Sequence, residues 1–75
     1  MQNIYYFRIR ESYEYCIHLY TPGVNSVVLV AEDGQRVKLP TVNLRPFVEQ
    51  RGLLGRFRLV TDCNNKVKSF ERVVT

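Results

Sequence analysis

Few residues of this 75-residue chain have the types and spacing needed to act chemically on a bound molecule. His18 is the one histidine, and the two cysteines, Cys16 and Cys63, lack the C-x-x-C spacing of a metal or redox site. No serine or cysteine lies in a nucleophile elbow, and the four glycines form neither a phosphate-binding loop nor a dinucleotide fingerprint. We therefore expect no enzyme, cofactor, metal site or small-molecule substrate, and we expect unpaired thiols in a reducing compartment.

Basic and aromatic side chains are the remaining candidates for a functional site. Eleven Lys and Arg outnumber seven Asp and Glu, which gives a net charge of +4 and a pI near 9.4. Such an excess favours loose association with polyanions, but it also occurs in domains that use charge for solubility alone. In "GLLGRFRLV", residues 52–60, Arg56 and Arg58 flank Phe57. This stretch is either a basic aromatic surface or the two faces of one half-buried strand.

The first third of the chain predicts a strand followed by a short helix. Residues 3–10 alternate in polarity, which is typical of a half-buried strand. Its apolar face holds three residues: Tyr5, Phe7 and Ile9. Ser12 is suited to cap a helix that ends at Pro22 and Gly23. Helical spacing gives that helix an apolar stripe of four residues: Tyr13, Cys16, Ile17 and Tyr20.

The middle of the chain predicts a β-hairpin. Asp33 and Gly34 lie between two β-rich runs in residues 25–40, and this dipeptide favours a two-residue turn of type I′. The resulting register places four apolar residues on one face: Val28, Val30, Val37 and Leu39.

Residues 41–52 are typical of a short helical segment. Asn43 is placed to cap it, Pro46 fits its first turn, and Gly52 is placed to end it. We expect three of its side chains to point inward: Leu44, Phe47 and Val48. Two further strands, residues 53–61 and 66–74, follow it.

The loop between the last two strands decides the nature of "GRFRLV". A loop of two or four residues places Phe57 and Phe70 on one face and leaves Arg56 and Arg58 beside Glu71. A three-residue loop or a bulge instead surrounds an exposed Phe70 with a basic face: Arg56, Arg58, Lys66, Lys68 and Arg72. Burying a phenylalanine is worth about 1.5–3 kcal/mol, more than an exposed ion pair returns. The first register is therefore favoured.

These elements predict an α+β fold in a single domain, residues 1–75. Five mainly antiparallel strands form a curved sheet with two short helices in the order β-α-β-β-α-β-β. A small, partly open barrel of the SH3-like kind is the alternative. The order also invites comparison with the RNA-recognition fold, but "GRFRLV" lies on the fourth strand rather than the third.

Several features together resemble a known family. They are the Asp33-Gly34 turn, Val37 with Pro40, the "LRPF" run at 44–47, Gly52 and Gly55 before Phe57, and Phe70. The chain resembles a family of short bacterial proteins, mostly from gammaproteobacteria, known as a domain of unknown function. The resemblance implies a stand-alone bacterial domain of the cytoplasm and transfers no functional residue.

Composition and patterning favour a non-catalytic binding domain, acting on a protein partner or a second copy of the chain. Candidate interface residues are Tyr6, Tyr15 and Phe70. The alternative is weak nucleic-acid binding through basic residues: Arg45, Arg51, Arg56, Arg58, Lys66, Lys68 and Arg72. The N-terminus has no basic leader before an apolar run, and no stretch approaches the roughly 20 apolar residues of a membrane span. We therefore expect a cytoplasmic protein without a membrane partner.

Overall fold

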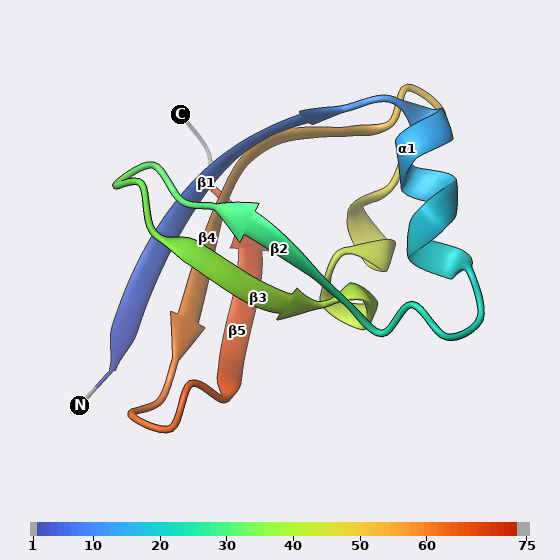
Figure 1. Ribbon diagram of the computed structural model, residues 1–75. Helices are drawn as coiled ribbons and strands as arrows, with labels where there is room; N and C mark the ends of the chain where they lie inside the picture. The colour runs from blue at the N-terminus through green and yellow to red at the C-terminus, as the bar shows by residue number, and fades with distance from the viewer. Residues whose placement is uncertain (1, 74–75) are drawn as a thin grey trace.

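Residues of alternating polarity form the strands of this domain, which the computed structural model describes over residues 2–73. The five strands are β1 (Asn3–Glu11), β2 (Ser26–Val30), β3 (Arg36–Pro40), β4 (Leu53–Thr61) and β5 (Val67–Arg72). They form two antiparallel sheets, ordered β1-β4-β5 and β2-β3 (Figure 1). The expected α+β class and element order are confirmed. The strands lie in two sheets rather than one, however, and over the described residues they close no barrel.

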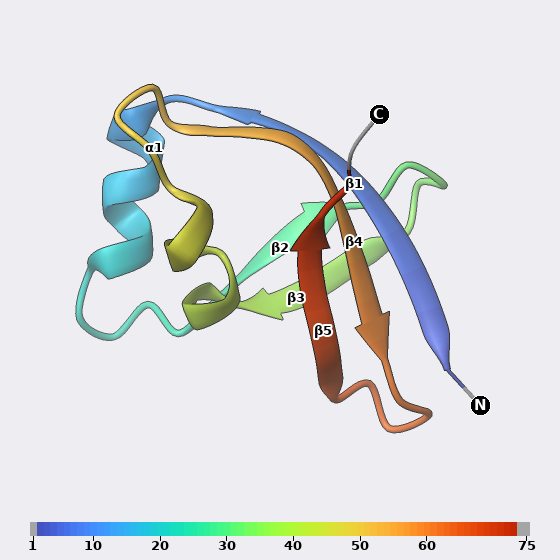
Figure 2. The same cartoon turned by 180° about the vertical axis from the view of Figure 1, so that it is seen from behind.

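Short helical segments lie together at one end of the sheets. Helix α1 (Tyr13–Ile17) continues into the 3-10 turn η1 (His18–Tyr20), and the 3-10 turns η2 (Thr41–Asn43) and η3 (Arg45–Phe47) follow β3. Seen from behind in Figure 2, β1 and β4 bend over together to reach this end, while the β2–β3 hairpin crosses the three-stranded sheet.

The core lies where the two sheets and the helical segments meet. Its buried side chains come from most elements of the chain: Phe7, Ile9, Cys16, Leu19, Ala31, Leu39, Leu44, Leu53, Phe57 and Leu59. The rings of Phe57 and Phe70 are stacked with centroids 5.2 Å apart, and Phe47 meets both edge-on. Phe7 lies opposite Phe57 across β1 and β4, which confirms the predicted inward face of the first strand.

Helix α1 begins where the sequence predicts, but it buries a different face. The amide of Tyr15 donates to Ser12 Oγ at 3.2 Å, so the predicted cap is confirmed. Cys16 and Leu19 are the buried residues of α1 and η1. The expected stripe is therefore wrong apart from Cys16. The side that packs on the core instead carries Tyr15, Cys16 and Leu19, which are also spaced as on one face of a helix.

The β2–β3 hairpin forms with a register one residue away from the predicted one. The amide of Gly34 donates to the carbonyl of Ala31 at 2.9 Å, and Gly34 has a φ of +91°. This closes a loop of three residues, 32–34, rather than a type I′ turn of two. A shift of one residue exchanges the faces of β2 relative to β3. Val37 and Leu39 face the core together as predicted, but Val27 and Leu29 lie opposite them. The prediction for Val28 and Val30 was wrong, because they are 59% and 61% exposed.

Residues 41–52 form two 3-10 turns rather than one helix. Pro46 lies in the first turn of η3 as predicted, but Asn43 makes no capping hydrogen bond. Gly52 ends no helix. It forms an isolated bridge with Glu49 at a φ of +108°, and a Cβ atom there would overlap the backbone carbonyl of Glu11. Gly52 therefore allows the segment that leads into β4 to lie close against the segment that follows β1.

The length of the loop between β4 and β5 would not by itself place Phe70 on the inner face, where it is found. The amide of Asp62 donates to the carbonyl of Lys66 at 2.9 Å, which leaves a loop of three residues, 63–65. Alone, this loop would place Phe70 on the outer face of the sheet. The strand expected to reach residue 74 ends at Arg72, and residue 74 lies outside the described part of the chain.

A bulge at the start of β5, where Lys68 is the extra residue between the partners of Thr61 and Val60, shifts the pairing a second time. Beyond the bulge, Leu59 lies opposite Phe70, and Arg58 lies opposite Glu71. The favoured register is therefore confirmed. It results from two shifts that cancel, rather than from a loop of two or four residues.

Candidate binding surfaces

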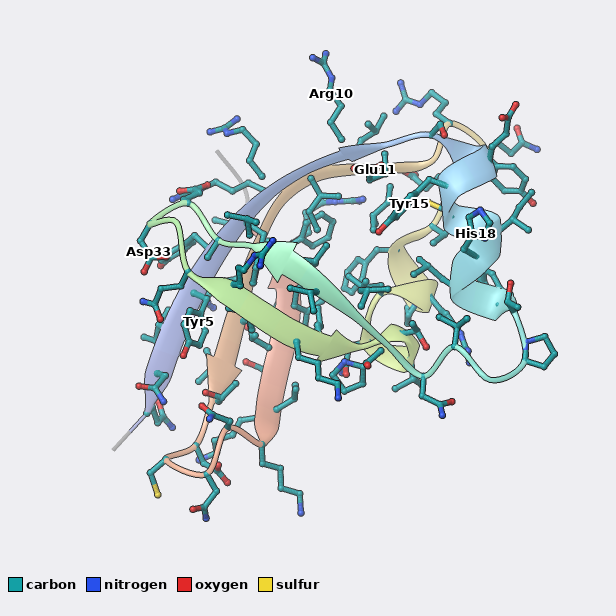
Figure 3. The ribbon with its side chains drawn as sticks, viewed as in Figure 1. Tyr5, Arg10, Glu11, Tyr15, His18 and Asp33 are labelled. Carbon is teal, nitrogen blue, oxygen red and sulfur yellow. The ribbon has the colours of Figure 1, made fainter. Side chains whose placement is uncertain are left out.

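The outer face of the β1-β4-β5 sheet carries four arginines around one tyrosine. Tyr6 lies opposite Arg58, and Arg8 lies opposite Arg56, so all four side chains share the face away from the core. The guanidinium carbon of Arg56 is 4.4 Å from the centroid of the Tyr6 ring. Arg10, two residues beyond Arg8, extends away from the sheet (Figure 3). Arg56 and Arg58 were predicted from the sequence as candidates. The two arginines of β1 were not, although their alternation with apolar residues indicates that they share one face of the strand.

Two of these arginines are already paired with carboxylates. Arg56 donates to both carboxylate oxygens of Glu32, at 2.8 and 3.0 Å, and Arg58 donates to Glu71 at 3.0 Å. The hydrogen bond from Arg56 lowers the pKa of Glu32. The amide of Glu32 also donates to the carbonyl of Tyr6 at 2.8 Å. Glu32 therefore ties the tip of the β2–β3 hairpin to the outer face of the β1-β4-β5 sheet. It also neutralises part of the positive charge of that face.

The other basic candidates do not extend this face. Arg45 is half-buried and donates to the carbonyl of Leu19 at 2.8 Å, which ties η3 to η1. Arg72 lies on the inner face of the sheet, 5.3 Å from the centroid of Phe57 and 3.7 Å from Glu49. The three remaining candidates are exposed at other places: Arg51, Lys66 and Lys68. The structure thus brings Arg56 and Arg58 together and disperses the other five.

The three candidate interface residues are all half-buried. Tyr6 lies under Arg56, and Phe70 belongs to the phenylalanine cluster of the core. Tyr15 is a residue of α1 near the end of β1 (Figure 3), where burial, followed by the charge of Glu11, raises the pKa of its phenol. These residues stabilise the domain and present little free surface.

An apolar stripe lies instead on the outside of α1 and η1. Tyr13, Ile17 and Tyr20 are 50%, 53% and 54% exposed, and they follow one another at helical spacing. Their spacing is apparent in the sequence, but it is the spacing expected of a buried face. We call these three residues the helix stripe.

The residues with intrinsic chemical reactivity do not converge. Cys16 is buried, and burial raises the pKa of its thiol, whereas Cys63 is exposed in the β4–β5 loop and His18 is exposed on η1. Among residues 2–73, no three His, Cys, Asp or Glu side chains come together as metal ligands do. Over the same residues, no helix combines the length and apolarity needed to cross a bilayer.

Two small crossed sheets with short helical turns, an arginine-rich outer face and an exposed helix stripe define a small α+β domain. Residues 3–73 match the family described as "Protein of unknown function (DUF2835)", and the chain belongs to this family. The match confirms the expected resemblance to a domain of unknown function over nearly the whole chain. Neither the curated proteins nor the solved structures include a significant match.

Proposed function

We propose that this domain is a non-catalytic protein-binding module that contacts its partner through the helix stripe. The observation that carries the proposal is that Tyr13, Ile17 and Tyr20 each leave about half of their surface exposed on one side of α1 and η1. Scattered apolar residues on a surface need no explanation, but contiguous patches mark interaction sites. Tyrosine is enriched at protein interfaces because its ring is apolar and its hydroxyl remains polar.

The stripe is also held in place before binding. The hydroxyl of Tyr20 donates to the carbonyl of Arg45 at 3.2 Å, and the Arg45 guanidinium lies 5.5 Å from the centroid of the Tyr20 ring. At the other end, the Ser12 cap fixes the start of α1. A side chain that is ordered beforehand loses less conformational entropy on binding, which favours affinity.

The test compares two isoleucines of nearly equal exposure. Ile17 is 53% exposed in the stripe, and Ile4 is 55% exposed on β1. The wild type, Ile17→Asp and Ile4→Asp are used as bait in extracts of the source organism, with quantitative mass spectrometry, and each is also examined by sedimentation velocity at several concentrations. We expect Ile17→Asp alone to lose a captured partner or a concentration-dependent shift in sedimentation. Equal behaviour of all three proteins would refute the proposal.

The geometry gives nucleic-acid binding less support. Two of the four arginines on the outer face are paired with carboxylates of the same chain, and the other basic candidates lie apart from them. A nucleic acid would have to displace Glu32 and Glu71 to reach Arg56 and Arg58, because these carboxylates accept the same N–H groups that a phosphate would.

A further inference from the structure

We propose that the free edge of β3 binds an extended, acidic segment of another protein as an added strand. This site is separate from the helix stripe and uses different chemistry. It rests on three features of the β2–β3 hairpin and its surroundings: unpaired backbone groups, a hollow beside them, and two positively charged side chains.

The backbone groups of two β3 residues point away from β2. Hydrogen bonds join Ala31 to Gln35 at one end of the hairpin and Thr41 to Asn25 at the other, at 2.8 and 3.0 Å. Hydrogen-bonded and non-hydrogen-bonded pairs alternate along an antiparallel ladder, so Val37 and Leu39 make the bonds to β2. Residues 36 and 38 alternate with these two along β3, so their N–H and C=O groups face the open edge. β3 has no strand on that side in the described part of the chain.

A hollow of about 180 Å³ lies along this edge. It is lined by residues 36–38 of β3 and, from the three-stranded sheet, by Tyr5, Leu59, Thr61 and Val67. In Figure 3 the side chain of Tyr5 lies beside the first residues of β3. A strand added to β3 would therefore extend the smaller sheet over a part of the larger sheet that β3 leaves uncovered.

One of the residues that line the hollow has a buried polar group without a partner. Thr61 is 3% exposed, and its Oγ1 makes no hydrogen bond with any described residue. A buried hydroxyl without a partner is unfavourable and rare in native structures. The Oγ1 atom has almost no contact with solvent, so a polar group of an added strand would reach it only after the atoms that cover it move aside.

Charge favours an acidic partner over a second copy of the chain. Arg36 and Lys38 are exposed, and neither forms an ion pair with a described residue. On an added strand, the residues beside them would share their face of the sheet, where opposite charges attract and like charges repel. Pairing of β3 with β3 of a second copy would place these cations against each other. Charged edge residues of this kind oppose self-association while leaving the edge open to a complementary strand.

The experiment selects short random peptides displayed on phage against the wild-type domain, with Lys38→Pro as the counter-selection. Proline removes the free N–H of residue 38, and the bonds from β3 to β2 remain because that N–H points outward. We expect enriched peptides to alternate Asp or Glu with apolar or hydroxyl residues, and we expect Lys38→Pro to weaken their binding about tenfold or more. Hydrogen exchange should show new protection at the amides of Arg36 and Lys38.

Further variants separate the edge from the helix stripe and from effects on folding. Lys38→Glu keeps the backbone donor, so it tests the charge even if Lys38→Pro does not fold, and it should abolish binding of the acidic peptides. Ile17→Asp should leave peptide binding unchanged. The proposal is overturned if enriched peptides are basic or bind Lys38→Glu equally well. It is also overturned if the amides of residues 36 and 38 stay unprotected, if no peptide is enriched, or if sedimentation shows a dimer that Lys38→Pro abolishes.

Discussion

Replacement of Thr61 by valine should stabilise the domain. Thr61 is 3% exposed, and its Oγ1 has no hydrogen-bond partner in the described structure. Valine has nearly the same shape and carries no hydroxyl, so the change removes an unsatisfied polar group without leaving a cavity. An unsatisfied buried group costs about 1–3 kcal/mol. We expect the free energy of unfolding to rise by about 1–2 kcal/mol, in the lower part of that range.

A second buried threonine provides the matched control. Thr41 is 1% exposed, but its Oγ1 donates to the carbonyl of Val24 at 3.2 Å and accepts a hydrogen bond from Arg45 at 3.4 Å. The same substitution, Thr41→Val, leaves both partners without their bond and should lower the free energy of unfolding by about 1–3 kcal/mol. The two variants should therefore shift stability in opposite directions.

Thermal and urea unfolding, followed by circular dichroism, measure both changes. For a chain of this length, the unfolding entropy is about 0.16 kcal/mol/K, so each 1 kcal/mol moves Tm by about 6 °C. Thr61→Val should then raise Tm by about 6–12 °C. If it lowers Tm as much as Thr41→Val does, the Thr61 hydroxyl is hydrogen-bonded in solution, and the reasoning about the hollow fails.

Four other outcomes are expected. Gly52→Ala should destabilise the domain by more than about 4 kcal/mol because its Cβ would overlap backbone, whereas Gly23→Ala, in open space at a φ of +90°, should cost about 1–2 kcal/mol in urea unfolding. A thiol reagent should modify Cys63 in the native protein and reach Cys16 only on unfolding; two native labels would contradict the burial of Cys16. The lowered pKa of Glu32 gives stability that is present above its ordinary pKa of about 4.3 and is lost as the pH falls through the lower folded value. Urea midpoints of Glu32→Gln should therefore fall less with acidification than those of the wild type, and parallel pH profiles would count against the ion pair. Amide NMR spectra should not change on addition of single-stranded RNA or DNA at physiological salt, and salt-resistant shifts on the outer sheet would reverse our ranking of the two functions.

The sequence predicted strands well where one face is clearly apolar and the other polar. The first strand and the fourth strand have such faces, and burial of Phe7 and Phe57 fixed their orientation. The β2–β3 hairpin was different, because residues 27–31 are apolar on both sides and either register buries valine or leucine. The choice depended on whether Asp33-Gly34 formed the whole loop or part of a longer one, which local sequence did not decide.

The surfaces were harder to predict than the core. The helix stripe has the spacing of a buried face, but Tyr15, Cys16 and Leu19 have such a spacing as well, and it is their side that packs on the core. The pairing of Arg56 with Glu32 joins a residue of β4 to a residue of the β2–β3 loop, 24 positions away, so no local pattern indicates it. The free edge of β3 likewise depends on the order of the strands, which patterning alone does not specify.

The cancelling register shifts between β4 and β5 constrain how the length of this hairpin can change. Insertion or deletion of one residue in the 63–65 loop would turn Phe70 to the outer face and bring Glu71 inward, unless the bulge disappeared at the same time. A single-residue length change is therefore unfavourable at either place alone and tolerable at both together. Members of the family should accordingly show these length differences as coupled pairs, with the aromatic residue of the last strand always returned to the core.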